Sequence, residues 1–66
     1  MTYQVYGDYG TDTQCELYSH NSLEFARRWL DGYIRWGDFG GYDHIYIVDK
    51  QGKLYKAVYA NNEEMV

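Results

Sequence analysis

Cys15 is the only cysteine in this chain of 66 residues, and that single thiol limits how the chain can be held together. A domain this small buries only about 60% of the surface its unfolded chain exposes, and many such domains rely on disulfides, metals or self-association. One cysteine excludes an internal disulfide and fits a reducing compartment. Aromatic residues make up 20% of the chain, and nine residues are tyrosine. We therefore expect one domain, residues 1–66, stabilised by aromatic packing or by self-association.

Hydrophobic periodicity predicts two hairpins with a helix between them. Residues 2–9 and 13–18 alternate as strands do, with turn residues at 10–12 and Gly7 as a candidate bulge. Residues 22–36 show helical spacing, with Asn21 and Ser22 as rival N-caps. Residues 43–59 form the second hairpin, whose turn at 49–52 ends in a left-handed Gly52.

The element order ββαββ predicts an α+β single domain: a four-stranded antiparallel sheet with one helix packed on one face. The strand order stays open. Because one helix covers one face, strand alternation should leave a second set of side chains uncovered. We expect that open face to carry Gln4, Tyr6, Glu16, Tyr18, His44, Tyr46 and Lys56, with Val5, Leu17, Ile45, Ile47 and Val58 facing the helix.

Three tyrosines on an uncovered face indicate either an interface or only the preference of tyrosine for strands. The segment WGDFGGYDH, residues 36–44, raises a similar choice. Gly37 suits a helix C-cap, but the role of a C-cap does not explain why aromatic rings surround this glycine. The rings of Trp36, Phe39 and Tyr42 either fold back as a lid on the core or contact a partner.

The residue types that carry catalysis are few. Cys15 with His20 or His44 would make a nucleophile and base, but Cys15 shares the predicted buried phase with Leu17 and is expected to be inert packing. No cysteine or histidine spacing is typical of a metal site, and no glycine-rich phosphate loop occurs. We expect no enzyme activity, no metal and no cofactor.

The net charge of −4 argues against direct nucleic-acid binding and permits an acidic surface that meets basic partners. No run approaches the roughly 20 apolar residues of a membrane span, and residues 1–8 are too polar for a signal region. These features predict a cytoplasmic protein without a membrane partner.

Residues 22–55, SLEFARRWLDGYIRWGDFGGYDHIYIVDKQGKLY, resemble small proteins of phages and other mobile elements, including some anti-CRISPR proteins. The shared features are the Ser-Leu helix start, the glycine-rich helix exit and the strand–Asp-x-x-Gly–strand ending. The resemblance implies a cytoplasmic inhibitor in a bacterial host cell, which binds a defence complex by its surface and without catalysis. It assigns no functional residue.

We therefore expect a phage-type anti-defence protein that binds a host nucleic-acid-targeting complex, with its acidic groups placed to occlude a basic nucleic-acid site. The alternatives are a small self-associating protein with a tyrosine-rich homodimer face and, third, a small enzyme that uses Cys15 and His44. The residues expected to contact the partner are Tyr6, Asp8, Asp12, Asp38, Phe39, Tyr42, Asp43 and Tyr46.

Overall fold

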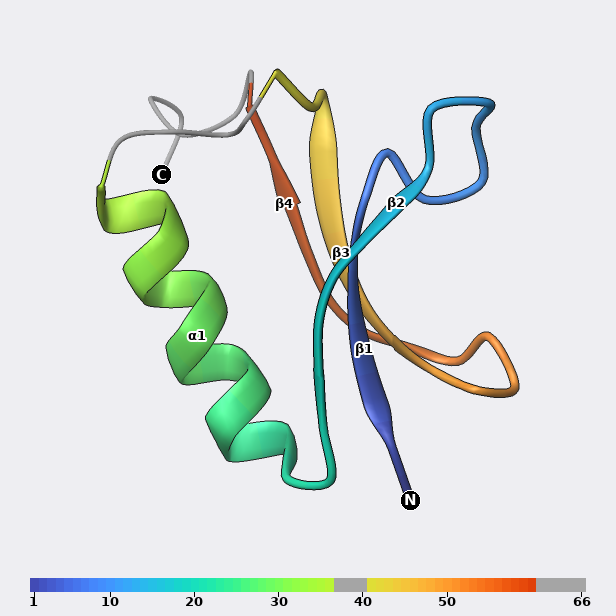
Figure 1. Ribbon diagram of the computed structural model, residues 1–66, viewed down its shortest axis with the longest axis vertical. Coiled ribbons are helices and arrows are strands. Elements are labelled where there is room, and N and C mark those ends of the chain that lie inside the picture. The colour runs from blue at the N-terminus through green and yellow to red at the C-terminus, as the bar shows by residue number, and fades with distance from the viewer. Residues whose placement is uncertain (37–40, 61–66) are drawn as a thin grey trace.

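The predicted order ββαββ is the order observed in the computed structural model (Figure 1). The structure describes residues 1–36 and 41–60. Its elements are β1 (Tyr3–Gly7), β2 (Cys15–His20), α1 (Leu23–Arg35), β3 (His44–Asp49) and β4 (Leu54–Tyr59). The strands form one antiparallel sheet in the order β2-β1-β3-β4, so β1 and β3 lie at its centre. The chain is an α+β fold in which α1 lies along one side of the sheet (Figure 1).

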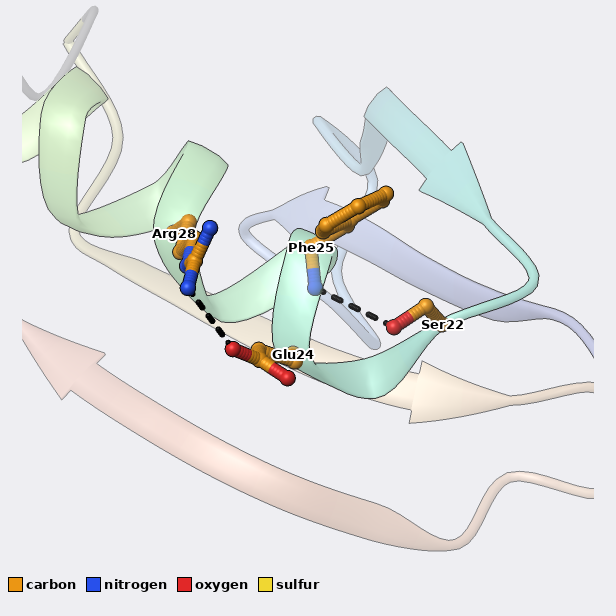
Figure 2. A network of polar contacts seen from close by, with 4 residues as sticks. All are labelled: Ser22, Glu24, Phe25 and Arg28. Carbon is orange, nitrogen blue, oxygen red and sulfur yellow. Dashed lines mark hydrogen bonds and ion pairs between the residues drawn. The ribbon is translucent and has the colours of Figure 1, made fainter.

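Ser22, one of the two predicted N-caps, caps helix α1. The Phe25 amide donates a hydrogen bond of 3.4 Å to the Ser22 Oγ, which satisfies one of the open N–H groups of the first turn (Figure 2). Ala26 and Leu30, one turn apart, are fully buried and face the sheet. This four-residue spacing of small and large apolar side chains is what seats the helix on the strands.

The core lies between α1 and the two central strands. Val5 from β1 and Ile45 and Ile47 from β3 are fully buried against Ala26 and Leu30. Tyrosines then extend this small cluster, as the composition predicts, because each ring adds a large buried area. The tyrosines packed against it are Tyr3, Tyr18, Tyr33, Tyr42 and Tyr55.

A bulge in β2 overturns the predicted position of Tyr18. Val5 pairs with Tyr18 whereas Tyr6 pairs with Glu16, so Leu17 is an extra residue opposite β1. An inserted residue shifts the alternation by one, and the side chains beyond it change face. Tyr18 consequently lies on the helix side, where its ring stacks on Trp29 at 4.9 Å. The predicted bulge at Gly7 is wrong, because the irregularity is in the partner strand.

A second bulge, in β4, moves Lys56 to the helix side. Ile47 pairs with Lys56 and Val48 pairs with Leu54, which leaves Tyr55 as the extra residue. Lys56 shares the face of the buried Ile47, and its Nζ lies 3.5 Å from a carboxylate oxygen of Asp31 on α1. The prediction that Lys56 lies on the open face is therefore wrong, and an ion pair to the helix replaces the expected solvent exposure.

The turn between β3 and β4 has the predicted chemistry. Gly52 has a φ of 85°, which only glycine adopts readily, and its amide donates to the Asp49 carbonyl over 3.0 Å. The Asp49 carboxylate accepts hydrogen bonds from the amides of Gln51 and Lys53 and from the Tyr55 hydroxyl. These donors favour its ionised form, so the pKa of Asp49 is lowered, chiefly by the Lys53 amide.

Candidate protein-binding face

The four tyrosines that do not pack against the core gather on the other side of the sheet. Tyr6 of β1 and Tyr46 of β3 are register partners, and His44 of β3 pairs with Tyr59 of β4. Tyr9, in the loop after β1, joins them. We call this group the tyrosine face; its members are Tyr6, Tyr9, His44, Tyr46 and Tyr59.

The rings of the tyrosine face form one connected cluster. Tyr9 bridges the two central strands, because its ring centroid lies 5.3 Å from that of Tyr6 and 6.0 Å from that of Tyr46. Tyr46 is in turn 4.4 Å from His44 and 6.0 Å from Tyr59. The Tyr59 side chain meets solvent, with 39% of the residue exposed, and the other four residues are half-buried. Rings held in this way present a preformed aromatic surface.

Polar contacts fix the orientation of these rings. The Tyr46 and Tyr59 hydroxyls are 2.9 Å apart, and this hydrogen bond is the main cause of the raised pKa of Tyr46. The His44 Nε2 lies 3.1 Å from the Tyr9 carbonyl oxygen, which ties the loop to β3. The pKa of Tyr6 is raised chiefly by burial and then by the Glu16 carboxylate. The raised pKa values of Tyr6 and Tyr46 keep these two hydroxyls protonated at neutral pH.

Acidic groups surround the tyrosine face. Asp12, Glu16 and Asp43 are exposed: Asp12 is in the loop that carries Tyr9, Glu16 is the register partner of Tyr6, and Asp43 directly precedes His44. No lysine or arginine is found among the strand residues that register and alternation place on this side: Gln4, Tyr6, Glu16, Ser19, His44, Tyr46, Val48, Leu54, Ala57 and Tyr59.

The lysines beside Gly52 in the β3–β4 turn are the basic residues nearest this face, because a Cβ at Gly52 would lie 3.6 Å from the Tyr9 hydroxyl. Three arginines are on α1, two lysines are in or beside the β3–β4 turn, and Lys56 reaches α1. The carboxylates of Asp12, Glu16 and Asp43 lie around the aromatic cluster, whereas the guanidinium groups are on α1 together with the carboxylates of Glu24 and Asp31.

Asp8 organises the loops beside this face. It has a φ of 54°, in the left-handed region that aspartate tolerates better than most residues. One carboxylate oxygen accepts from the Asp43 amide at 2.7 Å and the other from the Thr13 hydroxyl at 2.8 Å. These bonds, the Thr13 one foremost, lower the pKa of Asp8. A buried carboxylate with both oxygens engaged holds the loops in place and offers little to a partner.

The structure separates the predicted partner-binding residues into groups. Tyr6 and Tyr46 are adjacent at the centre of the tyrosine face, and Asp12 and Asp43 are exposed near it. Asp8 is buried, as described above. Asp38 and Phe39, like the predicted C-cap Gly37, lie outside the described residues.

Two rings of the segment 36–44, predicted either to cover the core or to contact a partner, differ in their burial. Tyr42 packs against the core, directly above Gly7 of β1, so it acts as a lid. A Cβ at Gly7 would lie only 2.6 Å from the Tyr42 ring, and glycine is what permits this close approach. Trp36, by contrast, is 87% exposed.

Sequence reasoning missed Tyr9 and Tyr59. The position of Tyr59 could have been predicted from alternation. Val58 was assigned to the helix side, so its neighbour Tyr59 belongs on the open face. Tyr9 lies in a loop, where no periodicity applies. Its position depends on the conformation of Asp8 and on the His44 contact, which a sequence pattern does not contain.

The residues considered for catalysis do not form a compact centre. Cys15 is exposed, so its predicted burial is wrong, and a hydrogen bond with the Tyr42 side chain, followed by burial, raises the pKa of Tyr42. His20 instead accepts from the Ser22 amide at 2.9 Å and packs on Phe25. Within residues 1–36 and 41–60, no group of three or more His, Cys, Asp or Glu is placed to hold a metal ion.

No family model, curated protein or solved structure matches this chain. In the part of the chain that the structure describes, no helix has the length and apolar character needed to cross a bilayer.

Proposed function

We propose that this protein is a non-catalytic binding module that docks through its tyrosine face onto a basic surface of a partner protein. The observation that carries the proposal is the pairing of a connected aromatic cluster with a surround that has carboxylates and no lysine or arginine among the described strand residues of that side. Aromatic anchors and complementary charge are the two features that most often define an interface.

The chemistry of the face favours arginine-containing partners. Tyrosine rings attract a guanidinium group through their electron-rich faces and stack on its plane. Glu16, paired with Tyr6, would accept hydrogen bonds from the same group. Because ring contacts already fix Tyr6, Tyr9 and Tyr46, little side-chain entropy is lost on binding.

The same charge disfavours a homodimer through this face. A twofold dimer brings identical patches together, so Glu16 and Asp43 of one copy would approach the carboxylates of the other. Like charges at an interface cost several kcal/mol. A partner of opposite charge avoids that repulsion, and the self-associating alternative is correspondingly weaker.

The resemblance of residues 22–55 to small phage proteins adds the class of partner. Complexes that target nucleic acids hold their substrate in basic grooves, and an acidic aromatic face is complementary to such a groove. The proposed activity is thus anti-defence inhibition of the anti-CRISPR type in the cytoplasm of a bacterial host cell. The module would occupy a basic nucleic-acid site by surface contact, with no chemical step and no direct nucleic-acid binding.

Affinity capture from bacterial lysate tests the proposal, with three proteins compared. The wild type should retain a basic nucleic-acid-binding protein that is released at high salt. The double variant Tyr46→Ala with Glu16→Lys should lose it, since one change removes the central ring and the other reverses the nearest charge. Phe25→Ala is the matched control, because Phe25 is an exposed aromatic residue on α1, away from the tyrosine face.

The purified partner then shows whether capture is inhibition. Adding the protein should reduce nucleic-acid binding by the partner in proportion to occupancy, and the double variant should not. Equal retention by the double variant and the wild type would contradict the assignment of the face. Retention of the partner with its nucleic-acid binding intact would contradict the inhibitory role alone.

A further inference from the structure

A second surface, along the flank of α1 where Trp29 stacks on Tyr18 of β2, has a different composition from the tyrosine face. A hollow of about 380 Å³ is lined by Arg28, Trp29, Gly32, Tyr33 and Trp36. Gly32 lies one turn from both Arg28 and Trp36, so the hollow runs along the helix with glycine in its floor. We call it the helix groove. Its size is within the range of sites that hold small ligands or short peptide segments.

Gly32 has no other role that the described residues reveal. Its φ lies outside the left-handed region, and a Cβ there would meet no atom within 4 Å. Glycine inside a helix is less favourable than alanine, so neither the backbone nor the packing of these residues explains it. Its effect on the surface is to leave the floor of the groove open.

Aromatic rings form the walls of the groove. Trp29 stacks on Tyr33 at 4.9 Å and on Tyr18 at 4.9 Å, so the fold fixes its orientation before any ligand binds. Trp36 is 87% exposed and is the most exposed large apolar side chain in the described part of the chain. Grooves lined by aromatic side chains are typical of sites that bind proline-containing extended peptides.

The one charged side chain that lines the groove is basic. Arg28 lines it, and Arg35 follows seven residues later, on nearly the same side of the helix. Arg28 pairs with Glu24 at 2.8 Å, but the two side chains are 70% and 69% exposed (Figure 2). Such exposed pairs contribute little, so Arg28 can exchange Glu24 for a carboxylate of a ligand.

We infer that the helix groove binds an extended, proline-containing acidic segment of a protein. The polyproline II conformation leaves its carbonyl groups unpaired, and the indole N–H groups of the two tryptophans are donors for them. Proline rings pack against the aromatic side chains that line the groove, and an acidic residue meets Arg28. This site is independent of the tyrosine face, because it lies on the other side of the sheet and selects the opposite charge.

Tryptophan fluorescence reads this site directly. The chain has two tryptophans and both line the groove, whereas the tyrosine face has none. The probe is a synthetic peptide of repeated Glu-Pro-Pro, titrated under excitation that tyrosine does not absorb. Two peptides serve as comparisons: Lys-Pro-Pro repeats keep the conformation and reverse the charge, and Glu-Ala-Ala repeats keep the charge and lose the proline.

Variants locate the response within the groove. Gly32→Leu places a side chain on the floor, where a Cβ meets no atom within 4 Å, and should weaken the apparent affinity for the Glu-Pro-Pro peptide about tenfold or more. Arg28→Gln should weaken it and abolish the preference over Lys-Pro-Pro. Gln51→Leu, which adds a leucine at an exposed position of the β3–β4 turn, should bind like the wild type. Circular dichroism of each variant verifies that it is folded.

A saturable response to Glu-Pro-Pro that exceeds both comparison peptides and falls in Gly32→Leu supports the inference. The inference is overturned if Glu-Pro-Pro gives no response, if Lys-Pro-Pro matches it, or if Gly32→Leu binds as the wild type does. A response to oligothymidylate without one to Glu-Pro-Pro also overturns it and makes the groove a nucleic-acid site. Gly32→Leu should still capture the basic partner protein through the tyrosine face, so the result for one site does not decide the result for the other.

Discussion

Replacing Gly7 with alanine places a methyl group where the Tyr42 ring already lies. The added Cβ would be 2.6 Å from the ring carbons Cγ and Cδ1, whereas ordinary contacts begin near 3.4 Å. These atoms are at the base of the ring, so a small rotation of the side chain does not clear them. Gly7 sits in the strand that pairs with both β2 and β3, which also restricts backbone adjustment.

The expected loss in the free energy of unfolding is about 1–2 kcal/mol. Overpacking in a well-packed site costs about 1–3 kcal/mol. The reduced freedom of alanine in the unfolded chain returns about 0.5–1 kcal/mol of that. A chain of 66 residues has a total stability of only about 3–10 kcal/mol, so the loss is a measurable fraction.

A double-mutant cycle in urea isolates the contact. Tyr42→Ala should destabilise the protein, because its ring packs against the core. In that background Gly7→Ala should be neutral or stabilising by up to about 1 kcal/mol, which gives a coupling of about 1–3 kcal/mol. If Gly7→Ala costs the same with and without the ring, Tyr42 does not cover Gly7 and its assignment as a lid is wrong.

Three further predictions concern the turns, the loops and the tyrosine face. Gly52→Ala should cost about 1–2 kcal/mol in urea unfolding because Gly52 has a φ of 85°, whereas Gly32→Ala should gain up to about 1 kcal/mol; equal effects would contradict the turn geometry. The pKa of Asp8 in the folded protein is below its ordinary value of 3.8. The stability that the Asp8 carboxylate contributes should therefore be complete above pH 3.8 and lost as the pH falls through the folded pKa. Asp8→Asn should make the loss of unfolding free energy at acidic pH shallower than in the wild type. Tyr59→Phe should lower the pKa of Tyr46 toward 10.0 in NMR titration of the labelled ring, and an unchanged pKa would show that the hydroxyl bond is absent.

Element type and order were predictable because they depend on local periodicity. Alternation identified the strands, helical spacing identified α1, and the Asp49 to Gly52 turn carried its own chemistry. The two bulges were not predictable. Each changes which side chain meets the core, and the choice depends on pairing across strands rather than on the sequence of one strand. Tyr18 and Lys56 were therefore assigned to the wrong side.

Part of the tyrosine face was predictable, because strand alternation is a local pattern. Tyr6 and Tyr46 follow from alternation in the regular central pair β1 and β3, where the register has no bulge. Tyr9 reaches the face only through a left-handed Asp8, and the sequence shows an aspartate there without its conformation. The exposure of Cys15 likewise depends on a position at the very start of β2, next to the loop.

The nine tyrosines allow one spectrum to test the docking claim, because the two sides of the sheet divide them. Fluorotyrosine labelling followed by fluorine NMR, with and without the partner protein that the wild type captures, reports every ring at once. The rings of Tyr6, Tyr9, Tyr46 and Tyr59 should shift or broaden, while Tyr3, Tyr18 and Tyr55 on the helix side stay unchanged. Changes confined to the helix-side rings, with the four open-face rings unaffected, would contradict the account.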